Sequence, residues 1–176
     1  MNKHFIVPPI LLIFLSFICL DSMAQSGKQC QVYSVDDLKR NRWVVVFKSE
    51  GKERKRITTH YTDKEVVNEI SFLLPDREPK NYVHKQSYYL SDGKANKFDK
   101  SKVGKVKSGN FIICEVEGVK GNPNQFVSQE IVRLNNQELS LYWCSPKDRI
   151  GGCDTMTWTN EKYIDVPPFI FKQSKK

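Results

Sequence analysis

The chain has 176 residues, of which 39% are hydrophobic and 27% are charged, and its formal net charge at pH 7 is +8. This balance favours anionic or neutral partners and argues against basic ones. The most informative sequence pattern lies in the first 24 residues. Lys3 and His4 precede an apolar run over residues 5–20, and Ser22-Met23-Ala24 has the small-x-small form of a signal-peptide cleavage site.

We therefore predict a signal peptide over residues 1–24 and a secreted, periplasmic or cell-envelope location for residues 25–176, which suit a single domain. Pro8-Pro9 interrupts the apolar run and no stop-transfer pattern follows it, so no transmembrane segment is expected in the mature chain. A lipid anchor at Cys19 is disfavoured because Phe17 and Ile18 stand where lipoprotein processing needs a small side chain.

Four cysteines follow the predicted cleavage site, and an even number in an exported chain favours disulfides. Cys144 and Cys153 flank a segment rich in proline and glycine, so we expect them to pair. Cys30 with Cys114 then follows by elimination. No Cys-x-x-Cys pair exists, which argues against zinc, and no metal site or cofactor is predicted.

The mature chain begins with an expected arm over residues 25–35 and a helical turn over 34–40, with Ser34 as its cap. The run 42–48 is rich in β-branched and aromatic residues and predicts a strand. Residues 53–61 alternate, but their faces are largely polar, so this strand is expected at a solvent-exposed margin.

Residues 62–74 fit two patterns. Thr62-x-x-Glu65 has the form of a helix capping box, and apolar residues follow at helical spacing up to Pro75. The alternation of Ile70, Phe72 and Leu74 instead favours a strand over 67–74, which we prefer.

Further strands are separated by segments rich in turn-forming residues. They are expected over residues 82–90, 110–117, 125–134, 138–144 and 154–159, with a tight hairpin at Asn135-Asn136-Gln137. The sequence thus predicts a mainly β domain of about eight strands with one or two short helices, forming an antiparallel sandwich or up-and-down barrel. It excludes a doubly wound α/β sheet.

Two stretches resemble the lipocalin-like domains of small exported bacterial proteins. They are Tyr88–Asp92 with Phe98–Lys105 and Ser108–Ile112, and the hairpin Ile131–Leu141. The resemblance implies an eight-stranded barrel, filled by side chains or enclosing one small ligand. Lipocalins usually carry Gly-x-Trp on the first strand, where the tryptophan closes the narrow end. Asn41-Arg42-Trp43 matches that place here, with the tryptophan and without the glycine.

Four aromatic residues are candidates for the lining of an apolar ligand pocket, with packing in the core as the alternative: Trp43, Tyr88, Trp143 and Trp158. His60 and His84 are expected on the surface. No nucleophile elbow, phosphate-binding loop, dinucleotide fingerprint or zinc-protease motif occurs, so no catalytic residue is proposed and the chain is not expected to be an enzyme.

The leading hypothesis is therefore a non-catalytic exported binding protein for a small apolar or amphipathic ligand. One alternative is a protein-interaction module, such as an inhibitor of an extracellular hydrolase, that uses the loops 75–81, 94–107 and 145–152. The other is a basic module for anionic glycans or other surface polymers, using lysines 94, 97, 100, 102, 105 and 107. Nucleic acid is disfavoured, since no arginine and only one aromatic residue, Phe98, interrupts these lysines.

Overall fold

The computed structural model describes residues 31–73, 78–116, 125–144 and 152–164. These residues form one α-helix, two 3-10 turns and ten strands. The helix is α2 (Val35–Lys39), and the turns are η1 (Lys100–Lys102) and η2 (Glu161–Tyr163). The strands are β1 (Tyr33–Ser34), β2 (Trp43–Ser49), β3 (Lys52–Tyr61), β4 (Glu65–Phe72), β5 (Lys80–Ser91), β6 (Ser108–Gly109), β7 (Phe111–Glu115), β8 (Phe126–Leu134), β9 (Glu138–Cys144) and β10 (Cys153–Asn160).

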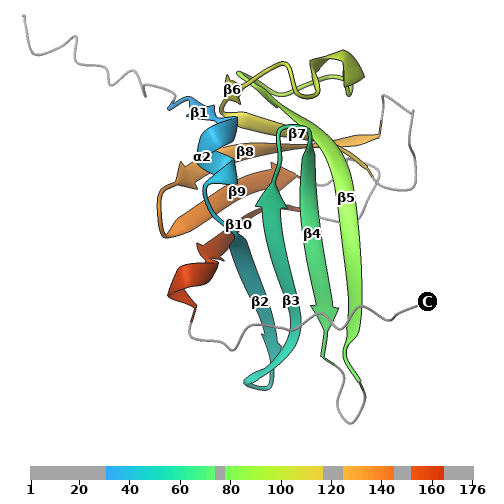
Figure 1. The fold of residues 1–176 in the computed structure, drawn as a ribbon, viewed down its shortest axis with the longest axis vertical. Coiled ribbons are helices and arrows are strands. Elements are labelled where there is room, and N and C mark those ends of the chain that lie inside the picture. The colour runs from blue at the N-terminus through green and yellow to red at the C-terminus, as the bar shows by residue number, and fades with distance from the viewer. Residues whose placement is uncertain (1–30, 74–77, 117–124, 145–151, 165–176) are drawn as a thin grey trace, which may run out of the picture. The chain divides into compact units, whose positions relative to one another are not determined.

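Eight of these strands close into an antiparallel barrel in the order β10-β2-β3-β4-β5-β7-β8-β9. Figure 1 shows β2 to β5 as long neighbouring strands, with β7 to β10 running across behind them. β1 and β6 form a separate two-stranded ladder. The predicted fold class, a mainly β up-and-down barrel of about eight strands, is confirmed.

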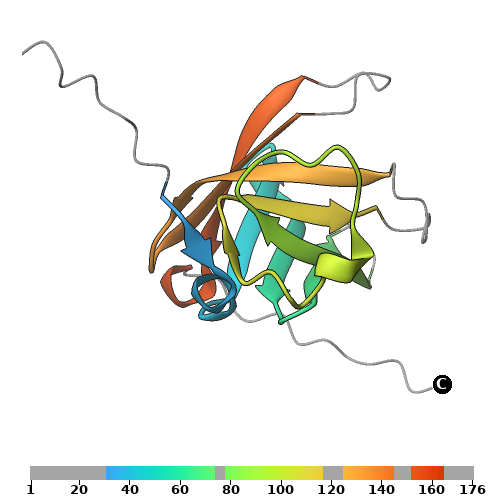
Figure 2. The ribbon, with the colours of Figure 1, turned by 90° about the horizontal axis from the view of Figure 1, so that it is seen from above.

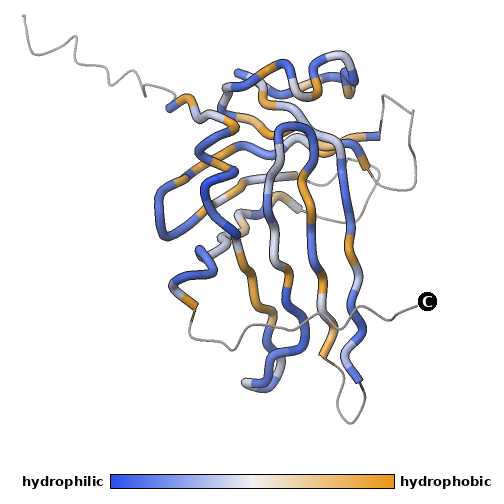
Figure 3. The backbone as a smooth tube through the Cα atoms, in the orientation of Figure 1, coloured by the Kyte–Doolittle hydropathy of each residue, from blue (hydrophilic) through white to orange (hydrophobic). Residues whose placement is uncertain are grey.

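Alternation along each strand divides the side chains between the inside and the outside of the barrel. Paired residues share a face, so the register follows the inner face around the wall: Trp43 pairs with Thr59, and Thr59 pairs with Asn68. Figure 3 shows apolar and polar residues following one another along the strands, with the turn between β2 and β3 hydrophilic. That turn has positive φ at Glu50 (52°) and Gly51 (74°), as a two-residue hairpin loop requires.

The predicted position of residues 53–61 at an exposed margin is wrong. β3 pairs with β2 on one side and with β4 on the other, so the closed barrel leaves it no free edge. Its polar residues have another explanation, because the inner face of this part of the barrel is itself partly polar.

The ambiguity over residues 62–74 is settled in favour of a strand, β4. The expected capping box instead forms a turn, in which the Thr62 hydroxyl accepts hydrogen bonds from the backbone N–H groups of Lys64 (3.3 Å) and Glu65 (2.9 Å). The chain then pairs with β3 and β5 along its whole length. Two complete ladders outweigh the local preference for a helix.

The short helix α2 forms where the sequence predicts it. The Ser34 hydroxyl accepts from the backbone N–H of Asp37 (3.1 Å), and the Asp37 carboxylate accepts from the backbone N–H of Ser34 (3.0 Å), which completes a capping box. Leu38 is 0% exposed and packs in the same apolar cluster as Trp43. The Trp43 indole N–H donates to the backbone oxygen of Leu38 (3.2 Å), so α2 is held at this end of the barrel.

The end of the barrel beside α2, which we call the packed end, is filled by large apolar side chains. Trp43, Leu90, Ile112 and Leu139 are all at most 1% exposed. Figure 2 looks onto this end and shows α2 and the 94–107 segment over it. Trp43 thus occupies the position that the lipocalin resemblance implies for the tryptophan of the first strand.

The 94–107 segment is anchored to the outside of the wall. Phe98 packs in a second apolar cluster with Tyr89, Phe111 and Ile113. Gly109, which follows this segment, lies so close to the backbone of Ser91 that a Cβ atom would overlap it.

Candidate ligand-binding cavity

A cavity of about 250 Å³ lies inside the barrel, next to the packed end. Its lining comes from seven of the eight barrel strands: Ile57, Thr59, Tyr61, Val66, Asn68, Ile70, His84, Gln86, Cys114, Val127, Gln129, Leu141 and Trp158. The barrel interior is therefore not completely filled by its own side chains, which makes the fold compatible with a binding protein.

Successive pairs across β3 and β4 form layers of the cavity. Tyr61 and Val66 pair deepest, against the packed end. Thr59 and Asn68 form the next layer, and the pair of Ile57 and Ile70 lies farthest from α2. The cavity thus has a largely apolar floor against the packed end, a polar layer in the middle, and an apolar layer on the side away from α2.

Amide and hydroxyl groups dominate the middle of the cavity. The Thr59 hydroxyl donates to Asn68 Oδ1 (2.7 Å), and Gln86 Nε2 donates to the backbone oxygen of Glu115 (3.0 Å). His84 pairs with Asn68 across β4 and β5, and Gln129 lies on the opposite wall. These groups give the cavity hydrogen-bonding capacity as well as apolar surface.

Trp158 has an indole N–H without a hydrogen-bond acceptor. The side chain is 9% exposed and lines the cavity, and its Nε1 is fully buried with no partner in the described structure. A buried N–H that lacks a partner destabilises the fold by about 1–3 kcal/mol, so such groups usually have an acceptor.

The four aromatic residues singled out from the sequence have different positions. Trp158 lines the cavity, whereas Trp43 is part of the packed end, in the core position that the sequence left open as the alternative. Tyr88 is 1% exposed and belongs to the same core; its hydroxyl donates to the backbone oxygen of Thr62 (2.7 Å). Trp143 is half-buried and pairs with Gln129, on the inner face but outside the cavity lining.

The floor of the cavity keeps its titratable groups neutral. Burial raises the pKa of Tyr61 well above its usual range, and burial also raises the pKa of Tyr88 and brings that of the Cys114 thiol to about 12. The rings of Tyr61 and Tyr88 meet edge to face with centroids 5.4 Å apart. This floor is therefore uncharged at neutral pH.

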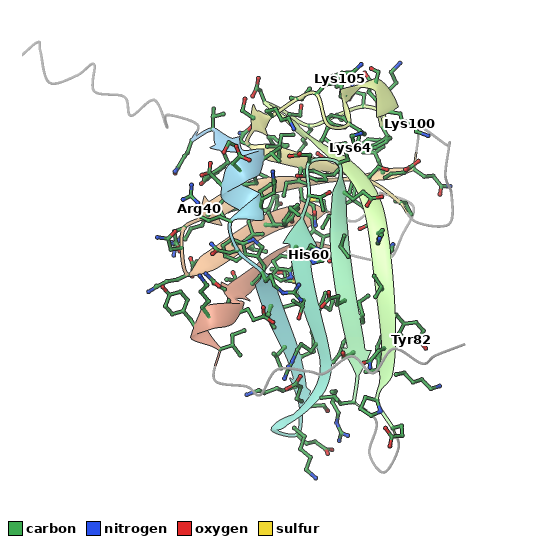
Figure 4. All side chains as sticks on the ribbon, viewed as in Figure 1. Arg40, His60, Lys64, Tyr82, Lys100 and Lys105 are labelled. Atoms are coloured by element: carbon green, nitrogen blue, oxygen red, sulfur yellow. A yellow bond between two sulfur atoms is a disulfide. The ribbon has the colours of Figure 1, made fainter. Side chains whose placement is uncertain are left out.

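The side of the cavity away from α2, which we call the mouth, is more exposed. Phe47, Lys55 and Phe72 share the inner face and are each partly buried. Tyr82 is 52% exposed and meets Phe72 edge to face with centroids 5.9 Å apart. Figure 1 shows that β2 to β5 extend past the other strands in this direction, and Figure 4 places Tyr82 on that extension.

His84 was expected on the surface, and that expectation is wrong, because the residue lines the cavity. The sequence reasoning missed it together with Gln86, although both belong to one alternating face, Tyr82, His84, Gln86 and Tyr88. Because Tyr88 was already a candidate for the barrel interior, the alternation could have indicated that His84 and Gln86 face the interior as well. His60 lies on the outer face, where burial first, and then Arg42, lowers its pKa.

The predicted disulfide between Cys144 and Cys153 is confirmed, and it joins directly paired residues of β9 and β10. Such a bond indicates an oxidising compartment. Cys114 is a buried thiol in the cavity lining. Cys30, its predicted partner, is outside the described residues, as is the predicted signal peptide, so the second bridge stays a prediction.

The outer surface carries two basic regions. A polar groove of about 410 Å³ lies beside α2. Lys39, Arg40 and Arg42 in its lining are paired with acidic side chains, and Lys162 lines it as well. The second region, which we call the lysine surface, contains exposed lysines that form no ion pair with described residues: Lys64, Lys94, Lys97, Lys100 and Lys105. Figure 4 shows Lys64, Lys100 and Lys105 toward the packed end of the barrel.

Two other loops were proposed for a protein partner, 75–81 and 145–152. Residues 75–77 of the first and 145–151 of the second lie outside the described part of the chain. Within the described ranges, no three His, Cys, Asp or Glu side chains are grouped so that they could hold a metal ion. No helix in those ranges has the length and apolarity needed to cross a bilayer.

The sequence matches no protein-family model and no curated protein.

Proposed function

We propose that this protein is a non-catalytic, lipocalin-like exported binding protein that holds one small amphipathic molecule inside its barrel. The observation that carries the proposal is the cavity of about 250 Å³, whose lining includes Trp158, a residue with an unpartnered indole N–H. A ligand with an acceptor atom would satisfy this donor. Its apolar part would pack against Ile57, Ile70 and Val127.

The mixture of polar and apolar walls selects the ligand class. Burial of apolar surface contributes about 25 cal/mol per Å² to binding, and a few positioned polar groups then fix the orientation of the ligand. Thr59, Asn68 and Gln129 supply such groups in the middle of the cavity. A purely aliphatic molecule would cover these groups without using their remaining hydrogen-bonding capacity, so an amphipathic one fits better.

A dye whose fluorescence rises in apolar surroundings tests the proposal. The expected result is saturable binding to the domain comprising residues 25–176. His84→Trp should weaken this binding strongly, because the larger ring occupies part of the cavity. Val83→Trp is the matched control, since Val83 is 57% exposed on the opposite face of the same strand, and it should bind like the parent. Absence of saturable binding by the parent domain would refute the proposal.

A second candidate function, binding of anionic surface polymers, is favoured by one observation, the unpaired cations of the lysine surface. Replacing Lys94, Lys97, Lys100 and Lys105 by glutamine should then weaken binding to an anionic polysaccharide column and reduce its salt dependence. Retention that is identical before and after the replacements would remove this candidate.

A further inference from the structure

Lys55 lies in an unusual place for a charged side chain, on the inner face of the barrel at the mouth of the cavity. The register pairs it with Phe47 on β2 and with Phe72 on β4. Its ammonium nitrogen lies 5.3 Å from the centroid of the Phe47 ring and 5.2 Å from that of Phe72. The charge is thus held between two aromatic faces.

No acidic side chain neutralises this charge within the described ranges. Its neighbours on the outer face are paired, Arg54 with Glu50 and Arg56 with Glu53, whereas Lys55 has only its two ring contacts. Each cation–π contact stabilises a partly exposed ammonium by about 0.5–1 kcal/mol, which holds the side chain in position without cancelling its charge. An anion that enters the mouth therefore meets a fixed cation that pairs with no acidic side chain of the described residues.

Lys55 is also continuous with the cavity. Ile57, two residues along β3, and Ile70, two residues back along β4 from Phe72, line the cavity on the same inner face. A molecule bound against Ile57 and Ile70 would therefore extend toward the Lys55 ammonium. The cavity lining itself, which includes the amides of Asn68 and Gln129 and the imidazole of His84, contains no lysine or arginine, so Lys55 is the nearest such cation on this inner face.

From this arrangement we infer that the barrel binds an anionic amphipathic molecule, whose negatively charged head pairs with Lys55 at the mouth while its apolar part occupies the cavity. The inference rests on the proposed function and adds the charge and orientation of the ligand. It also predicts selectivity against a cationic head, because Lys55 occupies the place between Phe47 and Phe72 that such a head would otherwise take.

Three probes with the same 12-carbon chain test the inference: dodecanoate, dodecanol and dodecyltrimethylammonium, each measured by displacement of the apolar dye. The parent domain should bind dodecanoate most tightly. Lys55→Met should weaken dodecanoate binding about tenfold, because it removes a charge-assisted contact, and leave dodecanol binding unchanged. Dodecyltrimethylammonium should bind Lys55→Met more tightly than the parent, since the two ring faces become free.

Two further variants control the experiment. Lys55→Arg keeps the charge and should retain the preference for dodecanoate. Lys48→Met removes an exposed lysine from the adjacent strand, one residue from Phe47, and should behave like the parent. Equal dodecanoate affinity in Lys55→Met and the parent would overturn the inference and leave the cavity function intact. Failure of all three probes to bind the parent would overturn both.

Discussion

The two ends of the barrel are built from the same alternating strands but are filled differently. At the packed end, Trp43 and Leu38 leave no exposed surface, and α2 covers them. Toward the mouth, the inner positions are occupied by medium-sized or polar side chains such as Ile70 and Asn68, and a cavity remains. The packed end forms the close-packed core, whereas space for the proposed ligand remains toward the mouth.

The largest expected difference concerns truncation of side chains at the two ends. Trp43→Ala should lower the free energy of unfolding by about 3–5 kcal/mol, because it opens a void among completely buried side chains. Ile70→Ala should lower it by about 1 kcal/mol, since Ile70 is half-buried beside a cavity that already exists. Urea unfolding followed by circular dichroism measures both, and equal losses would contradict the comparison.

The disulfide offers a way to weaken one region without changing the packed end. Removal of the Cys144–Cys153 bond in a Cys144→Ser, Cys153→Ser double variant should lower the free energy of unfolding by about 2.5 kcal/mol in the chain-entropy model. Hydrogen exchange should accelerate most at the adjoining ends of β9 and β10. Faster exchange of the α2 amides to the same extent would show that the two regions are not independent.

Gly109→Ala tests the close backbone approach at the packed end. A Cβ atom at this position would overlap the backbone of Ser91, and φ is +157°, so the substitution should lower the free energy of unfolding by about 2 kcal/mol. Gly93→Ala is the matched control, because a Cβ atom there meets open space. Calorimetric unfolding should separate the two variants clearly, and a neutral Gly109→Ala would contradict the described packing.

The smallest effect is expected from the cap of α2. Ser34→Ala should lower the free energy of unfolding by about 1 kcal/mol at pH 7. The Ser34 hydroxyl is the main cause of the lowered pKa of Asp37, so the Asp37 carboxylate stabilises the fold above its unfolded pKa of about 4 and loses this effect as the pH falls through its folded pKa. The difference between parent and variant should therefore shrink in acid. A difference that grows on acidification would contradict this assignment.

The barrel could be predicted because its determinants are local. The hairpin between β8 and β9 is an example: Asn135 Oδ1 accepts from the backbone N–H groups of Gln137 (2.8 Å) and Glu138 (2.9 Å), as turn-forming residues in this position indicate. Alternation and turn residues similarly predicted most of the other strands. Residues 62–74 were ambiguous because only the neighbouring strands decide between the two local patterns.

The cavity could not be predicted in the same way, because an empty interior depends on side chains from all around the wall. The polar alternation of β3 was interpreted as an exposed margin, whereas Lys55 and Thr59 face the inside of a partly polar barrel. Trp43, Tyr88 and Trp158 were equivalent in the sequence. Only their depth in the barrel distinguishes two core residues from one that borders the cavity.

The central claim is that a ligand enters the barrel beside Trp158 and leaves the packed end unchanged. Nuclear magnetic resonance of the domain labelled with ¹⁵N-tryptophan tests it directly, because the Trp43 indole N–H is already bonded to Leu38 and serves as an internal control. Addition of dodecanoate should shift the Trp158 indole signal saturably and leave that of Trp43 in place. An unchanged Trp158 signal, or equal shifts of both, would contradict the account.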